Sequence, residues 1–203
     1  MDFLQLKKNL KNDFSGLPLQ KIAVLADSAS QFLCQALKGY GYTRGIHLDI
    51  WEADYDRIYQ TVLDENSKLY TSKPEFVLIF QSAKKLLSNF YETSGERKKN
   101  WAEDQANHIE TVINAINKNS SCNIIYLNFP EINDAVFGNF SNKISFSFPF
   151  QLRLLNMELM KMAAGKKNLN IWMRQSKKIR SNSLKFATLG SNANVIFFKE
   201  YTI

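Results

Sequence analysis

The stretch Lys21-Ile-Ala-Val-Leu-Ala-Asp27-Ser28 decides the fold of this chain. Its apolar run, Ile22 to Ala26, is typical of a strand that is buried on both faces, as strands of parallel sheets are. Apolar residues at helical spacing follow at once, between Phe32 and Leu37. Doubly wound proteins place their chemistry where such a strand ends and the next helix begins. Asp27 and Ser28 are therefore the first candidate site residues.

The remaining sequence repeats this alternation of short apolar runs and amphipathic stretches. We expect strands at 21–27, 47–53, 76–80, 123–128 and 169–173, and helices at 3–14, 28–38, 55–65, 83–91, 98–118 and 149–164. The first helix is expected to close one end of the sheet and the second to stop at Gly39 and Gly41. Residues 131–148 are expected to form a long structured loop. The pattern predicts an α/β fold of three layers, a doubly wound and mostly parallel sheet of about five strands.

Charge is distributed unevenly along the 203 residues. The net charge is +7, yet nine Lys and Arg residues and no acidic residue lie between Glu158 and Glu200. We therefore expect one domain over 1–172 and a basic tail over 173–203, within which 194–198 could add a sixth strand. A tail that binds polyanions is one reading of this charge. Without an RNP-like aromatic pattern, zinc spacing or basic zipper, the sequence argues against nucleic acid as the partner.

The cysteines and the amino-terminal residues indicate a compartment. Cys34 falls in a predicted helix and Cys122 at the start of a predicted strand. Both are interpreted as small, buried hydrophobic side chains of a protein in a reducing compartment. Neither a secretory leader nor an apolar stretch long enough for a bilayer is present in the sequence. We expect a cytoplasmic protein without a membrane segment.

Polar side chains follow each predicted strand at the same edge of the sheet. They are Glu52 and Asp54, then Gln81 and Ser82, then Asn128. In a doubly wound sheet these positions open on one crevice, where the Ser28 hydroxyl could act as a nucleophile and helix amides or a Gln or Asn side chain could hold an oxyanion. Two plainer readings stand beside this one. Ser28 to Gln31 also matches a helix capping box. In addition, strands often end in polar residues because the loops that follow them are exposed to solvent.

The usual partners of a nucleophilic serine are missing from the sequence. A base, most often histidine, is normally needed. His47 falls at the opposite end of its predicted strand, and His108 falls in the middle of a predicted helix. No glycine-rich phosphate loop, HExxH, CxxC or DxDxT motif occurs, so the sequence indicates neither a metal nor a cofactor.

Five blocks of the sequence occur together: Leu6-Lys-Lys-Asn-Leu-Lys-Asn-Asp-Phe14, Lys21 to Ser28, Glu52-Ala-Asp-Tyr55, Phe76 to Ser82, and Asn128-Phe-Pro-Glu-Ile-Asn133. They resemble the N-terminal domain of FkbH-like proteins of the HAD-IIIC group. The resemblance spans about residues 1–172 and implies an SGNH-like or flavodoxin-like sheet. In this family an HAD phosphatase-type domain follows the SGNH-like one, and no HAD motif occurs in this sequence. Residues 173–203 are therefore interpreted as a non-homologous ending, such as a reading-frame slip.

The resemblance also implies a chemistry. Ser28 matches the serine of the SGNH Gly-Asp-Ser block, which here is Ala-Asp-Ser, and Asp54, Tyr55, Gln81, Ser82 and Asn128 would line the crevice. The block that normally supplies Gly and Asn as oxyanion donors is Phe80-Gln81-Ser82 here, and the Asp-x-x-His block that supplies the base is absent.

FkbH-like proteins handle a phosphorylated three-carbon acid and load a glyceryl unit onto a carrier-protein thiol. We therefore expect either a module that handles acyl or glyceryl esters or a non-catalytic module that docks an acyl carrier protein or an HAD partner. The sequence leaves open whether this chain is itself an enzyme, a hydrolase or a transferase.

Overall fold

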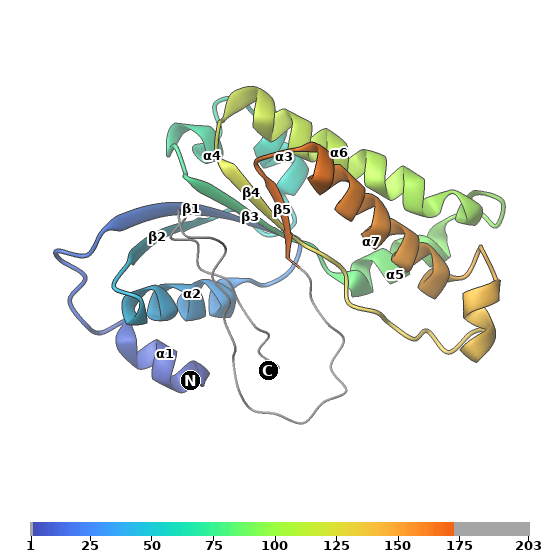
Figure 1. The fold of residues 1–203 in the computed structure, drawn as a ribbon, viewed down its shortest axis with the longest axis horizontal. Helices are drawn as coiled ribbons and strands as arrows, with labels where there is room; N and C mark the ends of the chain where they lie inside the picture. Colours follow the sequence, from blue (N-terminus) through green and yellow to red (C-terminus); the bar gives the residue numbers. More distant parts are fainter. Residues whose placement is uncertain (1, 173–203) are drawn as a thin grey trace.

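The computed structural model describes residues 2–172. Its helices and strands alternate along the chain (Figure 1). Their bounds are α1 (Phe3–Asn9), β1 (Leu19–Ala26), α2 (Gln31–Thr43), β2 (His47–Glu52), α3 (Ile58–Leu63), α4 (Lys68–Thr71), β3 (Phe76–Phe80), α5 (Ala83–Glu92), η1 (Arg97–Lys99), α6 (Trp101–Asn119), β4 (Asn123–Leu127), η2 (Gly138–Lys143), α7 (Phe148–Gly165) and β5 (Leu169–Trp172). The predicted tail over 173–203, with its strand at 194–198, lies outside the described residues.

Within these residues the strands form one five-stranded sheet in the order β2-β1-β3-β4-β5. Every pair is parallel, and Ile22 of β1 pairs with Ile50 of β2 and with Phe76 of β3. This order is that of flavodoxin-like doubly wound folds, whose ligands bind outside the carboxyl ends of the central strands. The predicted fold class is confirmed, and β2 lies at an edge as its alternating pattern indicated.

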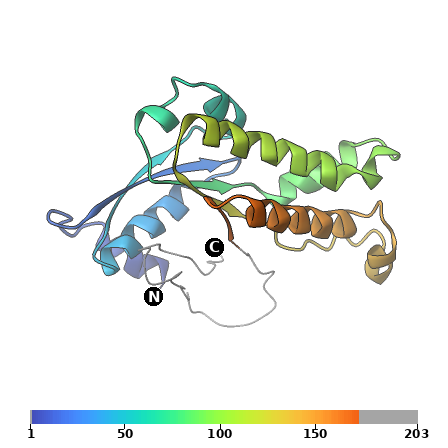
Figure 2. The ribbon, with the colours of Figure 1, turned by 45° about the horizontal axis from the view of Figure 1, so that its top comes forward.

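The two faces of the sheet are covered unequally. Helices α3 to α7 pack on one face and bury side chains such as Leu25, Ile79 and Ile124. On the other face, α2 covers a smaller cluster through Cys34 and Leu37. Figures 1 and 2 show α2, with α1 outside it, on the opposite side of the strands from α6. Both cysteines are buried and unpaired, as expected.

Helix α2 does not stop at its glycines, as the sequence suggested, but continues to Thr43. Gly39 is needed for close packing, because a Cβ there would lie 2.1 Å from the carbonyl oxygen of Leu6. The Asn9 side chain donates to the Gly39 carbonyl at 3.0 Å. Helix α1 thus packs on α2 instead of closing an end of the sheet, and it ends at Asn9, earlier than predicted.

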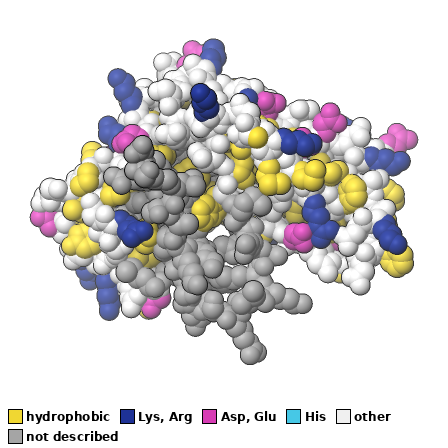
Figure 3. All heavy atoms as spheres, in the orientation of Figure 1, with side chains coloured by type: hydrophobic (Ala, Val, Ile, Leu, Met, Phe, Trp, Pro, Cys, Tyr) yellow, Lys and Arg dark blue, Asp and Glu magenta, His cyan; other side chains and the backbone are white. Residues whose placement is uncertain are grey.

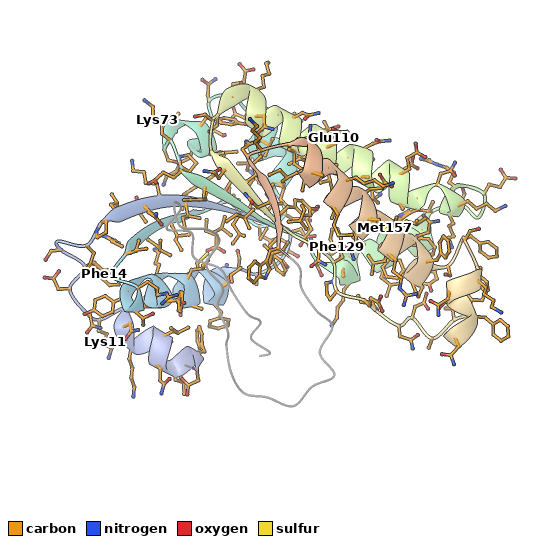
Figure 4. The ribbon with its side chains drawn as sticks, viewed as in Figure 1. Lys11, Phe14, Lys73, Glu110, Phe129 and Met157 are labelled. Atoms are coloured by element: carbon orange, nitrogen blue, oxygen red, sulfur yellow. The ribbon has the colours of Figure 1, made fainter. Side chains whose placement is uncertain are left out.

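The long loop before α7 is structured, as expected. It contains η2, and the guanidinium of Arg153 anchors it through Nε and Nη2 to the Glu131 carboxylate at 2.7 and 3.0 Å. The outer surface of α7 exposes Met157 and Met160. Hydrophobic side chains are visible along this helix in Figure 3, and Met157 is labelled in Figure 4. Over residues 2–172, none of the helices is both long and apolar enough to cross a membrane.

Replacing Gly39 with alanine should destabilise the protein although alanine favours helix. The added methyl group would push against the backbone of Leu6, and such overpacking costs about 1–3 kcal/mol. The free energy of unfolding in urea measures this loss. Gly95→Ala is the matched control, since a Cβ there meets no atom within 4 Å. Equal stability of the two variants would contradict the packing described for α1 and α2.

Candidate active site

The ends of β1 and β3 are joined through Asp27. Its carboxylate accepts the backbone N–H of Ser82, with 2.9 Å to Oδ1 and 3.0 Å to Oδ2. Its own N–H donates to the carbonyl of Phe80 at 3.2 Å. Asp27 is 7% exposed, so the amide at the start of α5 satisfies a buried carboxylate. This pair fixes the carboxyl edge where the predicted crevice lies.

The pKa of Asp27 is raised above its ordinary value. Burial is the main cause, because it disfavours the charged form. The Ser82 N–H and the Lys85 ammonium lower the pKa, Asp56 raises it, and the neighbouring Ser28 hydroxyl has a small lowering effect. The carboxyl group is thus more basic than an exposed aspartate.

Ser28 does not cap the following helix. Helix α2 begins three residues later, at Gln31, and its N-cap residue Ser30 makes no side-chain capping hydrogen bond. The Oγ of Ser28 is buried and has no hydrogen-bond partner, so its contact with Asp27 is at most a weak polar one. The capping-box reading of Ser28 is therefore wrong, because residues 29 and 30 are not helical.

A cavity of about 250 Å³ opens beside this serine. It lies between the end of β1, the start of α2 and the segment after β2. Its lining residues are Ala26, Ser28, Ser30, Gln31, Glu52, Ala53, Asp54 and Tyr55. The Ser30 hydroxyl donates to Glu52 Oε1 at 2.5 Å, which ties the two loops together. Of the predicted site residues, the structure brings Ser28, Asp54 and Tyr55 to this cavity.

The segment after β2 is held in place by Lys85 of α5. The ammonium of Lys85 lies 2.9 Å from Asp56 Oδ1 and 4.7 Å from the centre of the Tyr55 ring. Asp56 has a φ of +59°, an uncommon conformation for a residue with a side chain. The predicted helix over 55–65 accordingly starts only at Ile58. Sequence reasoning missed Lys85 and Asp56, although Lys85 stands three residues after Ser82, one helical turn along.

The other predicted site residues turn to different partners. Gln81 accepts a hydrogen bond from the hydroxyl of Tyr126, a buried side chain whose pKa burial raises. Ser82 contributes its amide to Asp27, as described above. Asn128 is buried, and its backbone N–H donates to the Trp172 carbonyl at 3.0 Å. Neither Gln81, Ser82 nor Asn128 lines the cavity beside Ser28.

The two histidines lie away from Ser28. His47 begins β2 at the amino edge of the sheet, where its ring centroid is 5.0 Å from that of Phe14, which is labelled in Figure 4. His108 is exposed on α6, with its ring edge-on to Tyr59. The carboxyl group nearest in sequence to Ser28 is Asp27. Among residues 2–172, no cluster of three or more His, Cys, Asp or Glu side chains could hold a metal ion.

The fold and this edge of the sheet define a doubly wound α/β domain with a serine beside a cavity. The model of the family described as "FkbH, N-terminal domain" matches residues 21–180, and the chain belongs to that family. This confirms the resemblance seen in the sequence. The match continues eight residues past the predicted domain boundary at 172.

One solved structure is similar over most of the chain. It is the crystal structure of the N-terminal part of the protein BF1531 from Bacteroides fragilis, which contains a phosphatase domain and is complexed with Mg. The two sequences are 32% identical, the TM-score is 0.78, and the match covers 84% of this chain. It covers only 44% of the other, so this chain spans less than half of that structure. Comparison with curated proteins gave no match.

Asp27→Asn should change how the stability depends on pH. Since the pKa of Asp27 is raised, the folded state holds this proton more tightly than the unfolded chain does. Its contribution to stability is then greatest below the unfolded pKa and falls as the pH rises through the raised pKa. The variant should lose this decline, which denaturation in urea across a series of acid to neutral pH values would measure.

Asp13→Asn is a control, because Asp13 is expected to affect the pH dependence of stability in the opposite direction. The pKa of Asp13 is lowered by hydrogen bonds from Ser15, so its contribution to stability is lost as the pH falls. Identical pH profiles for the Asp27 variant and the original protein would contradict the role of burial at Asp27.

Proposed function

We propose that Ser28 handles a short acyl or glyceryl ester at the carboxyl edge of the sheet. The observation that carries this proposal is the buried Ser28 Oγ, which lacks a hydrogen-bond partner beside a cavity of about 250 Å³. Leaving a buried hydroxyl unsatisfied costs about 1–3 kcal/mol. Such a group in a native structure calls for an explanation. Because the Oγ is inaccessible in this conformation, the proposal includes a rotation of the Ser28 side chain toward the cavity, where a bound ligand becomes its partner.

The proposed step is an acyl transfer. The Ser28 Oγ attacks the ester carbonyl carbon and forms a C–O bond, and the bond from that carbon to the departing alcohol or thiol breaks. The proton of Ser28 passes to Asp27 and then to the leaving group. Water, or the acceptor hydroxyl or thiol, then takes the acyl group from Ser28. The amides of the first turn of α2, which Ser30 leaves uncapped, would face the developing negative charge.

Asp27 is the proposed proton acceptor because of its position and its basicity. It directly precedes Ser28, and burial raises its pKa. The N–H of Ser82 uses only part of the acceptor capacity of the carboxylate, since two oxygens offer about four lone-pair positions. Asp27 thereby takes the place that histidine has in a serine triad.

The comparison with BF1531 suggests the setting of this chemistry. That structure contains a phosphatase domain, and the resemblance to FkbH-like proteins implies the loading of a glyceryl unit onto a carrier protein. We propose that this domain acts beside an HAD-type partner on a group bound for an acyl carrier protein. The second candidate is a domain that only docks these partners. The absence of a histidine near Ser28 within the described residues favours this second candidate.

Hydrolysis of para-nitrophenyl acetate tests the first candidate. The protein should release para-nitrophenol, and Ser28→Ala should reduce the rate by about a hundredfold or more, because the nucleophile is lost. Ser88→Ala is the matched control, since Ser88 is an exposed serine of α5. Equal rates for the two variants would exclude Ser28 as the nucleophile. An inactive protein that binds an acyl carrier protein would favour docking.

The same variant makes a prediction for stability. Because Ser28→Ala removes a buried hydroxyl that has no partner, the free energy of unfolding should stay equal or rise by about 1 kcal/mol. Thermal or urea denaturation of the variant and the original protein measures the difference. A loss of more than about 1 kcal/mol would mean that the hydroxyl supports the fold.

A further inference from the structure

The cavity beside Ser28 is bordered by acidic side chains. Glu52 and Asp54 are among its lining residues, and none of the lining residues in the described part of the chain is basic. The Asp27 carboxylate adjoins Ser28 behind this lining. Of the cations nearby, Lys85 has its ammonium paired with Asp56 at 2.9 Å. Lys38 lowers the pKa of Cys34 but does not line the cavity. The charge around the cavity is therefore negative within residues 2–172.

The negative charge of Glu52 influences the ionisation of a neighbouring side chain, Cys34. The pKa of the Cys34 thiol is raised to about 12, mainly by burial and next by the negative charge of Glu52. The carboxylate of Glu52 also accepts a hydrogen bond from the Ser30 hydroxyl, and this bond holds the carboxylate at the cavity. An anion that enters the cavity would meet the same negative potential.

We infer that this cavity accepts an uncharged short ester or thioester and excludes phosphorylated or carboxylate-bearing acids, with Glu52 and Asp54 determining this selection. The inference rests on the proposed function for the nature of the reacting bond, whereas the charge selection concerns binding alone. A volume of about 250 Å³ suits a short acyl or glyceryl unit and not a long chain. A phosphorylated three-carbon acid would thus reach Ser28 only after its phosphate had been hydrolysed and its carboxyl group had been converted to an ester or thioester.

Electrostatics sets the size of the effect. Two unit charges of the same sign that lie a few ångströms apart near a protein surface repel each other appreciably, and salt weakens the repulsion only in part. We expect an anion to bind at least about tenfold more weakly than a neutral compound of the same size.

The experiment compares three-carbon probes in the full chain that carries Ser28→Ala, which prevents turnover. Methyl glycerate is neutral, glycerate carries one negative charge, and phosphoglycerate carries more. Titration followed by NMR should shift the backbone amides of Ser28, Gln31 and Tyr55 with methyl glycerate. At constant ionic strength, phosphoglycerate should bind at least about tenfold more weakly. Glu52→Gln together with Asp54→Asn should remove most of this difference, because both changes keep the side-chain size.

Asp49→Asn is the matched control, since Asp49 is an exposed carboxylate of β2 that does not line the cavity. The inference is overturned if phosphoglycerate binds as tightly as methyl glycerate, if methyl glycerate leaves these amides unchanged, or if Asp49→Asn narrows the difference as much as the double variant. Failure of the proposed function would instead appear as ester hydrolysis that does not depend on Ser28. The binding ratio can be measured in either case.

Discussion

The hydrogen bonds between the Asp27 carboxylate and the Ser82 amide hold together the carboxyl edge of the sheet at the candidate active site. They join the carboxyl ends of the adjacent strands β1 and β3, and the loop after β1 contributes Ser28 to the cavity. Ser28 directly follows Asp27 in the sequence, and Lys85 lies one helical turn after Ser82. The carboxylate is buried and its pKa is raised, a property that supports the role of proton acceptor proposed for Asp27.

The strands of the sheet were predicted well because a buried parallel strand is recognised locally as a short, continuous apolar run. The apolar run of β3 was assigned with the bounds that the structure shows, and all five strands were found within about two residues, the uncertainty usual at element ends. Helix ends were predicted less well. Gly39 is a helix-stopping residue by local rules, yet it lies inside α2, because the approach of α1 requires a residue without a side chain. That approach is a tertiary contact, which no local pattern encodes.

The candidate site was predicted in part. Asp27 and Ser28 were located at the edge of the sheet because strand ends of parallel sheets coincide there, and Ser28, Asp54 and Tyr55 meet at the cavity. Gln81 and Asn128 lie at the same edge but contact other parts of the fold. The spacing from Ser82 places Lys85 at the same end of its helix, but its contacts could not be predicted from sequence, because they depend on the left-handed backbone of Asp56 and on the ring of Tyr55.

The unequal covering of the two sheet faces has a consequence for motion. Within residues 2–172, 26 buried side chains form the cluster beneath α3 to α7, whereas seven form the cluster beneath α2. Local stability follows the amount of buried apolar contact, so α2 and the edge strand β2 form the weaker cooperative unit. Gln31 of α2 and Glu52 of β2, together with the residues that flank them in the adjoining loops, form most of the cavity lining. Transient separation of this unit would widen the entrance to Ser28 while the larger cluster stays folded.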